Sequence, residues 1–338
     1  MSHTNIAEQA ISVFHSYKEK QSENTAREYR RHVQYFTEYL NEHTDVDLWS
    51  CHSGHVEEYY LKMLEDGYAP SSVRVAHAGI SDFYQVVEEF GQDGRRGFPQ
   101  ISIDQDPTEY ASPERLDGMH KKSKKEMEGG DRPLSQEEVS ELIDNVPAPT
   151  VRNKLICKIL YQTGIRRSEL VRIKLEDIDF EERRIDVDDV KTEDSREVWY
   201  QPILDSLLSM WIEADRPAVF YADESDYLFP TKRGVRMQEQ TVSEVVSQAA
   251  ENADLQEEIY QTKRPTNAKD GYKTPTVKRV GAHTLRKSFG VHFINQGGDI
   301  SFLADLLGHE DIETTKDSYL KYSSKDLRNS ARQYGPSI

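Results

Sequence analysis

The segment 91–130 interrupts the helical periodicity of this 338-residue chain and constrains its fold more than any other feature. It is rich in Gly, Pro and charged residues and has no sustained apolar face, a composition typical of a linker. On either side, the chain is long enough to bury a core of its own. We therefore expect an N-terminal domain over 1–112, a linker over 113–130 and a second domain over 131–338.

Apolar residues before this interruption recur at helical spacing. A helix over Asn24–His43 places its apolar side chains on one face, at positions spaced by four, three and four: Tyr29, Val33, Phe36 and Leu40. A second helix is expected to begin at Ser71, a residue type that favours N-caps, and to show the same pattern through Phe90. These amphipathic helices predict a helical bundle for the first domain.

The second domain combines helices with a hairpin. Ser135 and Glu138 have the spacing of a capping box. Further helices are expected at Val151–Gln162, which ends before Gly164, and at Gln238–Ala253, Thr284–Asn295 and Ser301–Leu307. Alternating apolar residues in two runs flank a polar turn and predict a β-hairpin: Arg184–Val190, Arg196–Gln201 and the turn Lys191–Ser195. The expected fold class is mainly α with a small antiparallel β-sheet in the C-terminal domain.

The average charge argues against a nucleic-acid partner, because 60 acidic residues outnumber 43 basic ones and the net charge is −17. Two local basic clusters reverse this balance, one in Gln261–Ser288 and one in the linker. We expect their cations to contact a DNA backbone: Lys263, Arg264, Lys269, Lys273, Lys278, Arg279 and Lys287 in the first, and Lys121, Lys122, Lys124 and Lys125 in the second. Solvated loop charge is the competing interpretation.

Other features narrow the class of protein. No apolar stretch approaches the roughly 20 residues needed to span a bilayer, and Met1–Ala10 lacks the pattern of a secretory signal. We therefore expect a cytoplasmic protein without a membrane partner. Cys51 and Cys157 are far apart and have no further ligand at metal-binding spacing, so we expect buried thiols, no metal site and no cofactor.

Three short stretches carry the candidate chemistry. They are Thr163–Leu170 (TGIRRSEL), His283–Arg286 (HTLR) and Leu307–His309 (LGH), the last followed after ten residues by Tyr319. In this order they resemble the tyrosine recombinase family, which includes phage integrases and Xer-type recombinases. The resemblance covers about 132–319. The first domain is similar to the family's SAM-like core-binding bundle by position and helix pattern only.

The resemblance implies a catalytic set, which maps onto Arg166, Lys191, His283, Arg286, His309 and Tyr319, with Glu169 as the acid that orients the first arginine. In this mapping Tyr319 is the nucleophile, and Lys191 protonates the leaving oxygen. Many relatives place the tyrosine nine positions after the last histidine, whereas Tyr319 lies ten positions after His309. Tyr322 therefore stays a competing nucleophile.

These residue types suit phosphoryl transfer. Two guanidinium groups, from Arg166 and Arg286, can hold the equatorial oxygens of a phosphodiester through paired hydrogen bonds. A tyrosine with an ordinary pKa of about 10 needs a base or a cationic field, and His283 is the candidate base for Tyr319. A hairpin lysine such as Lys191 can protonate the departing 5′ oxygen.

Each of these residues also has an ordinary structural interpretation. A lone arginine more often lies in a surface ion pair, and a lone histidine more often caps or packs. Tyr319 lies near Tyr322, so aromatic packing is the default for either ring. Lys191 is the weakest candidate, because turns commonly carry lysine and this one is surrounded by acids. The joint occurrence of the whole set in one order favours catalysis.

The resemblance implies a site-specific DNA recombinase or integrase that cleaves and rejoins double-stranded DNA through a 3′-phosphotyrosine, without a metal. It also implies a C-shaped clamp of two domains and a homo-oligomer, dimer to tetramer, on DNA. A non-catalytic DNA-binding regulator with the same fold is the alternative, and the complete residue set argues against it. A type IB topoisomerase shares the chemistry, but the two-domain length and the Gly-His before the tyrosine favour the recombinase.

Overall fold

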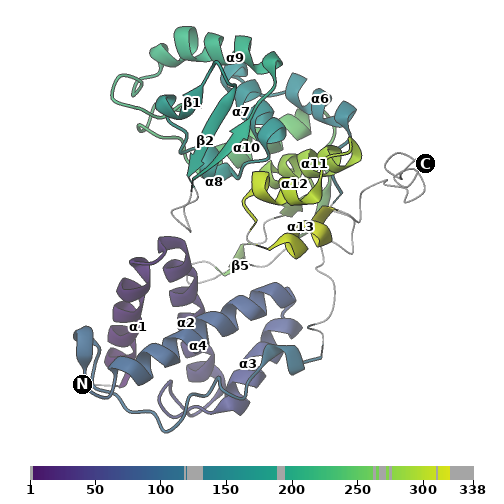
Figure 1. The fold of residues 1–338 in the computed structure, drawn as a ribbon. Coiled ribbons are helices and arrows are strands. Elements are labelled where there is room, and N and C mark those ends of the chain that lie inside the picture. The colour runs from purple at the N-terminus through teal and green to yellow at the C-terminus, as the bar shows by residue number, and fades with distance from the viewer. Residues whose placement is uncertain are drawn as a thin grey trace, which may run out of the picture. The chain divides into compact units, whose positions relative to one another are not determined.

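The structure, a computed structural model, describes residues 3–117, 119, 132–188, 195–261, 264–265, 272–273, 276–309 and 311–319 (Figure 1). The chain divides into two compact units, one of residues 1–127 with 262–275 and the other of residues 128–261 with 276–338. Most of the described residues are helical, and the strands form small antiparallel sheets. The expected fold class, mainly α with a small antiparallel sheet, is confirmed.

The first unit is a helical bundle, as expected. Its helices are α1 (His3–Glu19), α2 (Glu23–His43), α3 (Ser53–Glu65) and α4 (Pro70–Phe90). Helix α2 packs against α1 and α4, and it buries Val33, Phe36 and Leu40 on the predicted face. Helix α4 begins at Pro70, after Ala69 at the N-cap, and not at Ser71, because the fixed φ of proline suits the first helical position.

The segment that follows α4 contributes to this bundle. It contains two 3₁₀ turns, η1 (Arg95–Gly97) and η2 (Pro113–Arg115), and it buries Phe98, Ile101 and Met119 in the first core. The bundle therefore extends into the part of the predicted linker that the structure describes. Residues 120–131 lie outside the described residues, and with them the predicted DNA contacts Lys121, Lys122, Lys124 and Lys125.

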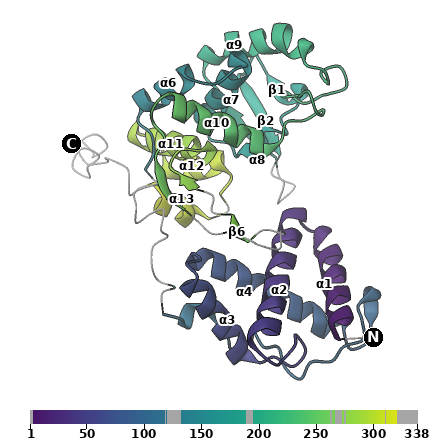
Figure 2. The ribbon, with the colours of Figure 1, turned by 180° about the vertical axis from the view of Figure 1, so that it is seen from behind.

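The second unit carries the candidate site on a larger set of helices (Figures 1 and 2). They are α6 (Gln136–Asp144), α7 (Thr150–Thr163), α8 (Arg167–Leu170), α9 (Asp205–Ser209), α10 (Glu239–Asn252), α11 (Ala282–Asn295), α12 (Ile300–Leu307) and α13 (Ile312–Tyr319). Shorter turns are η3 (Leu175–Asp177), η4 (Pro202–Leu204), the π-helix η5 (Met210–Asp215) and η6 (Arg216–Ala218). None of the helices among the described residues is long and apolar enough to cross a membrane.

Helix α7 is the centre of this unit. It packs against α6, α8, α10, α11 and η5, and it buries apolar side chains around most of its circumference: Leu155, Ile156, Cys157, Ile159 and Leu160. Such a helix belongs inside a core. It ends at Gly164 in the left-handed region (φ 67°), as expected. A Cβ there would lie 2.4 Å from the Phe289 ring and 2.8 Å from Leu307, so only glycine fits.

The predicted hairpin is confirmed as part of a three-stranded antiparallel sheet. Its strands are β1 (Ile178–Asp179), β2 (Arg184–Asp188) and β3 (Ser195–Trp199), in the order β1-β2-β3. Asp188 pairs with Ser195 at the end of the hairpin that adjoins the turn. The turn 189–194, with Lys191, lies outside the described residues.

Two short strand pairs lie in the basic segment, where the sequence predicted no strands. Strand β4 (Glu258–Gln261) pairs with β7 (Thr276–Lys278), and β5 (Arg264–Pro265) pairs with β6 (Tyr272–Lys273), all antiparallel. Strands of two to four residues are too short to show a periodic pattern, so sequence alone could not identify them.

Candidate active site

The turn between α7 and α8 positions Arg166. Its backbone N–H donates to Glu169 Oε2 over 2.5 Å, and its Nη1 donates to Glu169 Oε1 over 2.9 Å. The carboxylate of Glu169, on the first turn of α8, thus holds both the backbone and the guanidinium of Arg166. The Arg166 side chain is 39% exposed, whereas that of Glu169 is 2% exposed. The Glu169 carboxylate therefore fixes the position of the Arg166 guanidinium, and its role as the orienting acid of a catalytic site stays a prediction.

Helix α11 carries Arg286 into the interior of the unit. The side chain is buried, and its guanidinium donates to Gly164 O and to Leu307 O, each over 2.7 Å. These carbonyls lie at the C-terminal ends of α7 and α12, where the helix dipole favours a cation. Burial lowers the pKa of Arg286 to about 10, so it stays charged near neutral pH.

The two arginines converge on consecutive carbonyls. Arg166 Nη2 donates to Gly308 O over 2.9 Å, directly after the Leu307 carbonyl that accepts from Arg286. Gly308 has a left-handed φ of 62° and caps α12. The turn after α12 is therefore where guanidinium groups from distant parts of the chain meet.

His309 follows this turn and is held as a neutral ring. Its Nε2 lies 3.1 Å from Arg286 Nη2, and its Nδ1 lies 2.6 Å from Thr315 Oγ1. Arginine can only donate, so Nε2 accepts and the ring proton lies on Nδ1, which donates to Thr315. Burial, and then the charges of Arg286, Arg166 and Arg196, lower the pKa of His309 to about 4.

Tyr319 ends helix α13 beside this histidine. The two rings are stacked, with centroids 6.3 Å apart and planes 24° from parallel. Tyr319 is 2% exposed and packs against Gly290 of α11, where an added Cβ would lie 2.4 Å from the ring. A glycine on α11 thus leaves the space in which the predicted nucleophile is seated.

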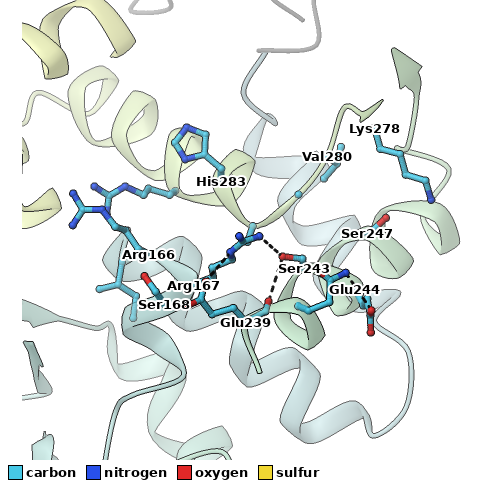
Figure 3. Close-up of a pocket in the computed structure, with 15 residues that line it drawn as sticks. Arg166, Arg167, Ser168, Glu239, Ser243, Glu244, Ser247, Lys278, Val280 and His283 are labelled. Carbon is cyan, nitrogen blue, oxygen red and sulfur yellow. Dashed lines mark hydrogen bonds and ion pairs between the residues drawn. The ribbon is translucent and has the colours of Figure 1, made fainter. Parts of the chain in front are cut away.

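An open pocket of about 730 Å³ lies next to the arginines. Arg166, Arg286 and the exposed His283, the second residue of α11, line it together with the polar face of α10. Figure 3 shows Arg166 and His283 at one end of the pocket and Lys278 at the other. Within it, Arg167 donates to Ser243 Oγ over 2.8 Å. Because the pocket is open to solvent, an anionic group can reach the arginines through it.

The structure brings together five of the six predicted catalytic residues, since Lys191 lies outside the described residues. Of the basic segment, Lys263 and Lys269 also lie outside, and only the backbone of Arg264 and Lys273 is described. Lys278 is exposed and pairs with Glu251. These positions remain predictions.

Two of the predicted DNA contacts need a correction. Arg279 is 3% exposed and pairs with Glu257 over 3.1 Å and with Glu138 over 3.5 Å, and Lys287 is 5% exposed. Both cations are held inside the unit and not on the surface where a phosphate backbone binds. Local charge density could not show this, because α11 turns Lys287 toward the core.

Two polar residues of this site were not among those predicted from the sequence. Thr315 is buried and holds His309, and Arg196 of β3 binds Glu169 through two hydrogen bonds of 3.0 and 2.9 Å. A signal for Arg196 was present. It stands two residues before the buried Val198, so strand alternation places both side chains on the inner face of the hairpin.

The sequence matches known protein families. Residues 132–325 match the phage integrase family, and residues 14–89 match the phage integrase N-terminal SAM-like domain. The tyrosine recombinase XerA of Pyrococcus horikoshii is 29% identical over 276 residues, which cover 80% of this chain and 83% of that relative. XerD of Yersinia pestis is 27% identical over 320 residues, which cover 93% of this chain and 92% of that relative. XerA of Pyrococcus furiosus is 30% identical over 203 residues, 59% of this chain and 60% of that relative.

Solved structures show the same fold. The XerH site-specific recombinase bound to a palindromic difH substrate, in a post-cleavage complex, has a TM-score of 0.64 at 19% identity and covers 92% of this chain and 80% of that one. The Tn1549 transposon integrase in complex with transposon right end DNA has a TM-score of 0.66 at 16% identity. The match covers 97% of this chain and 100% of that one.

The chain therefore belongs to the phage integrase family, and it is an enzyme of the tyrosine recombinase class. The family, expected from the order of the motifs, is confirmed. The relatives named here are recombinases, so they give no support to the non-catalytic alternative.

Proposed function

We propose that this enzyme cleaves and rejoins double-stranded DNA at a specific site through a covalent 3′-phosphotyrosine on Tyr319. The observation that supports this most directly is the meeting of Arg166 and Arg286 at the Leu307 and Gly308 carbonyls, next to His309 and Tyr319. Two fixed cations on one edge of an open pocket suit a single phosphate group.

In this proposal the arginines hold the reacting phosphate. Arg286 is anchored by two helix-end carbonyls, so it contributes a fixed charge, whereas the half-exposed Arg166 faces the pocket. Together they stabilise the negative charge that develops on the equatorial oxygens during displacement. Fixed donors cost no reorganisation when the charge appears.

Protons move through the remaining groups. His283, exposed at the pocket edge, accepts the proton of the Tyr319 hydroxyl as its oxygen attacks phosphorus. The 5′ oxygen leaves and takes a proton from Lys191. A 5′ hydroxyl of another strand then attacks the phosphotyrosine and gives its proton to the neutral Lys191. The phosphodiester is restored as the Tyr319 oxygen leaves and takes its proton back from His283. The covalent link conserves the energy of the broken bond, so the exchange needs no nucleotide hydrolysis.

Strand exchange between two duplexes needs more than one protomer, so the proposal includes a homo-oligomer, from dimer to tetramer, on DNA. Lys278 and the other cations predicted from the basic clusters, except the buried Arg279 and Lys287, contact the DNA backbone. The substrate also sets the compartment. An enzyme that exchanges DNA strands works where DNA is kept, which agrees with the cytoplasmic location expected from the sequence.

A nicked suicide substrate tests the proposal. After cleavage, the short strand that carries the 5′ hydroxyl diffuses away, so the protein–DNA adduct accumulates and can be separated by denaturing electrophoresis. We expect an adduct with the wild type and none with Tyr319→Phe, which keeps the ring and removes the nucleophile. Tyr322→Phe is the matched control and should form the adduct. Loss of the adduct with Tyr322→Phe instead would assign the nucleophile to that residue.

Arg166→Ala separates binding from cleavage. We expect this variant to bind the same DNA, because one phosphate contact among many is lost, and to form adduct at least about a hundredfold more slowly. A wild-type cleavage rate would remove Arg166 from the site.

A further inference from the structure

Arg196 of β3 reaches from the sheet to the residues that hold Arg166. Its Nη1 and Nη2 donate to Glu169 Oε1 and Oε2 over 3.0 and 2.9 Å, and its Nε donates to Leu306 O over 2.9 Å. The side chain is 14% exposed. All three of its nitrogens donate within the protein, so this guanidinium is oriented toward the protein and not toward a ligand.

Arg196 completes the coordination of a buried acid. Each carboxylate oxygen of Glu169 accepts one hydrogen bond from Arg196 and one from Arg166. Burial alone would raise the pKa of Glu169, but the hydrogen bonds and charges of Arg196, followed by those of Arg166, outweigh it and lower the pKa. The acid is therefore ionised and fully bound.

The charges of this cluster matter for Arg166. One carboxylate shared with one arginine would leave that pair neutral, and the positive charge offered to a phosphate would be largely cancelled. With Arg196 added, the two arginines and one glutamate carry a net charge of +1. Arg196 thus offsets Glu169 electrostatically and leaves the charge of Arg166 available to the pocket.

Arg196 also fixes the second anchor of Arg166. A Cβ built on Gly308 would lie 3.0 Å from Arg196 Nη1 and 3.2 Å from its Cζ, so the guanidinium lies directly against the Gly308 backbone. The carbonyl of this same Gly308 accepts from Arg166 Nη2. Arg196 therefore binds the Glu169 carboxylate and packs beside Gly308, the residue whose carbonyl accepts from Arg166.

We propose that Arg196 is a positioning residue for DNA cleavage: it holds Glu169 and Gly308 in place, and through them it orients and leaves charged the phosphate-binding Arg166. This inference rests on the proposed function, because it assigns Arg166 to the reacting phosphate. On this proposal, β3 contributes to cleavage through Arg196, independently of the predicted turn that contains Lys191.

The test is single-turnover adduct formation on the nicked substrate, at saturating protein, together with the Kd for the same DNA. Arg196→Ala should lower the rate about a hundredfold, the cost of misplacing a transition-state contact, while the Kd changes less than about threefold. The rate of Arg196→Lys should lie between those of the wild type and Arg196→Ala, because lysine supplies the charge without the paired donors of a guanidinium. Wild-type rates in Arg196→Ala would overturn the inference.

A second substrate separates the phosphate clamp from leaving-group protonation. Replacing the bridging 5′ oxygen by sulfur gives a leaving group that departs without a proton. The defect of Arg196→Ala should persist on this substrate, since it acts through Arg166. Recovery to near the wild-type rate would assign Arg196 to the function of Lys191, five residues earlier, and would overturn the inference.

Stability is controlled with two further variants. Arg184→Ala removes an arginine of the neighbouring strand that pairs with Glu197 over 2.9 Å, and it should cleave normally. Arg196→Ala combined with Glu169→Gln also removes the buried carboxylate, which the single variant leaves with the hydrogen bonds of Arg166 alone. The double variant should therefore fold even if the single variant does not, and it should still cleave slowly. A wild-type rate in this double variant would overturn the inference. Absence of any adduct with the wild type would instead overturn the proposed function, and this inference with it.

Discussion

Gly290→Ala tests whether Tyr319 attacks DNA from its seat, the buried position that its ring occupies against Gly290. The added Cβ would lie 2.4 Å from Tyr319 Cε1, 2.6 Å from Cδ1 and 3.0 Å from Cζ. To reach an ordinary contact distance the ring must retreat by about 1 Å, and a displacement of that size from attack geometry costs roughly a hundredfold in rate. We therefore expect adduct formation to slow about a hundredfold.

The same change has a calculable effect on folding. Alanine in the interior of α11 gains about 1 kcal/mol of helix propensity over glycine, and the clash costs about 1–3 kcal/mol. In the wild-type background the free energy of unfolding should therefore fall by up to about 2 kcal/mol. When Tyr319→Ala removes the ring, the same Gly290→Ala change should raise it by about 1 kcal/mol.

Urea unfolding of the four proteins in this double-mutant cycle measures the coupling, and the suicide substrate measures the rate for the two proteins that keep the tyrosine. Equal effects of Gly290→Ala in both backgrounds would show that the ring does not occupy this seat in solution. A folded Gly290→Ala protein that forms adduct at the wild-type rate would refute the idea that Tyr319 reacts from it.

Three further predictions concern the residues around this seat. Burial lowers the pKa of His309 to about 4, below its unfolded value of about 6.5. The contribution of the neutral ring to stability is therefore complete above about pH 6.5 and is lost as the pH falls toward 4. Urea unfolding should show a loss of about 1–2 kcal/mol over this range, after allowance for partial exposure, and His309→Gln should not show it. An equal pH dependence in both proteins would contradict this. Gly164→Ala should lower the free energy of unfolding by roughly 2–4 kcal/mol, since it combines a left-handed alanine with a 2.4 Å contact to Phe289. An unchanged free energy by urea unfolding would show that the turn relaxes. Arg286→Ala should cost roughly 2–4 kcal/mol by the same assay and abolish the adduct, because the Gly164 and Leu307 carbonyls lose their donors, and a fully stable, active variant would argue against the anchored arginine.

Much of the helical architecture could be predicted from local pattern. The face of α2, the capping box at Ser135, the end of α7 at Gly164 and the β2–β3 hairpin all depend on residues within a few positions of one another. Periodicity reports such local geometry directly. The short pairs around β4 and β5 could not be predicted, because two to four residues carry no period.

The predicted basic surface shows the limit of reading charge along the chain. Lys278 is exposed, but the neighbouring Arg279 is buried between Glu257 and Glu138, and Lys287 is buried on α11. Which cations face solvent depends on acids that are distant in sequence and on the rotation of a helix. Net charge over a segment contains neither.

Sequence by itself determined the chemical types and their order, an arginine with its acid, a His-x-x-Arg, a Gly-His and a tyrosine, and this order was enough to identify the family. Only the tertiary structure decided that Arg166 and Arg286 meet on consecutive carbonyls, that Gly290 makes room for Tyr319, and that Arg196 holds the acid and the glycine behind Arg166. The physical reason is that these contacts join helix ends and a strand from distant parts of the chain. Hydrogen bonds between such groups are set by the packing around α7, which local patterns do not encode.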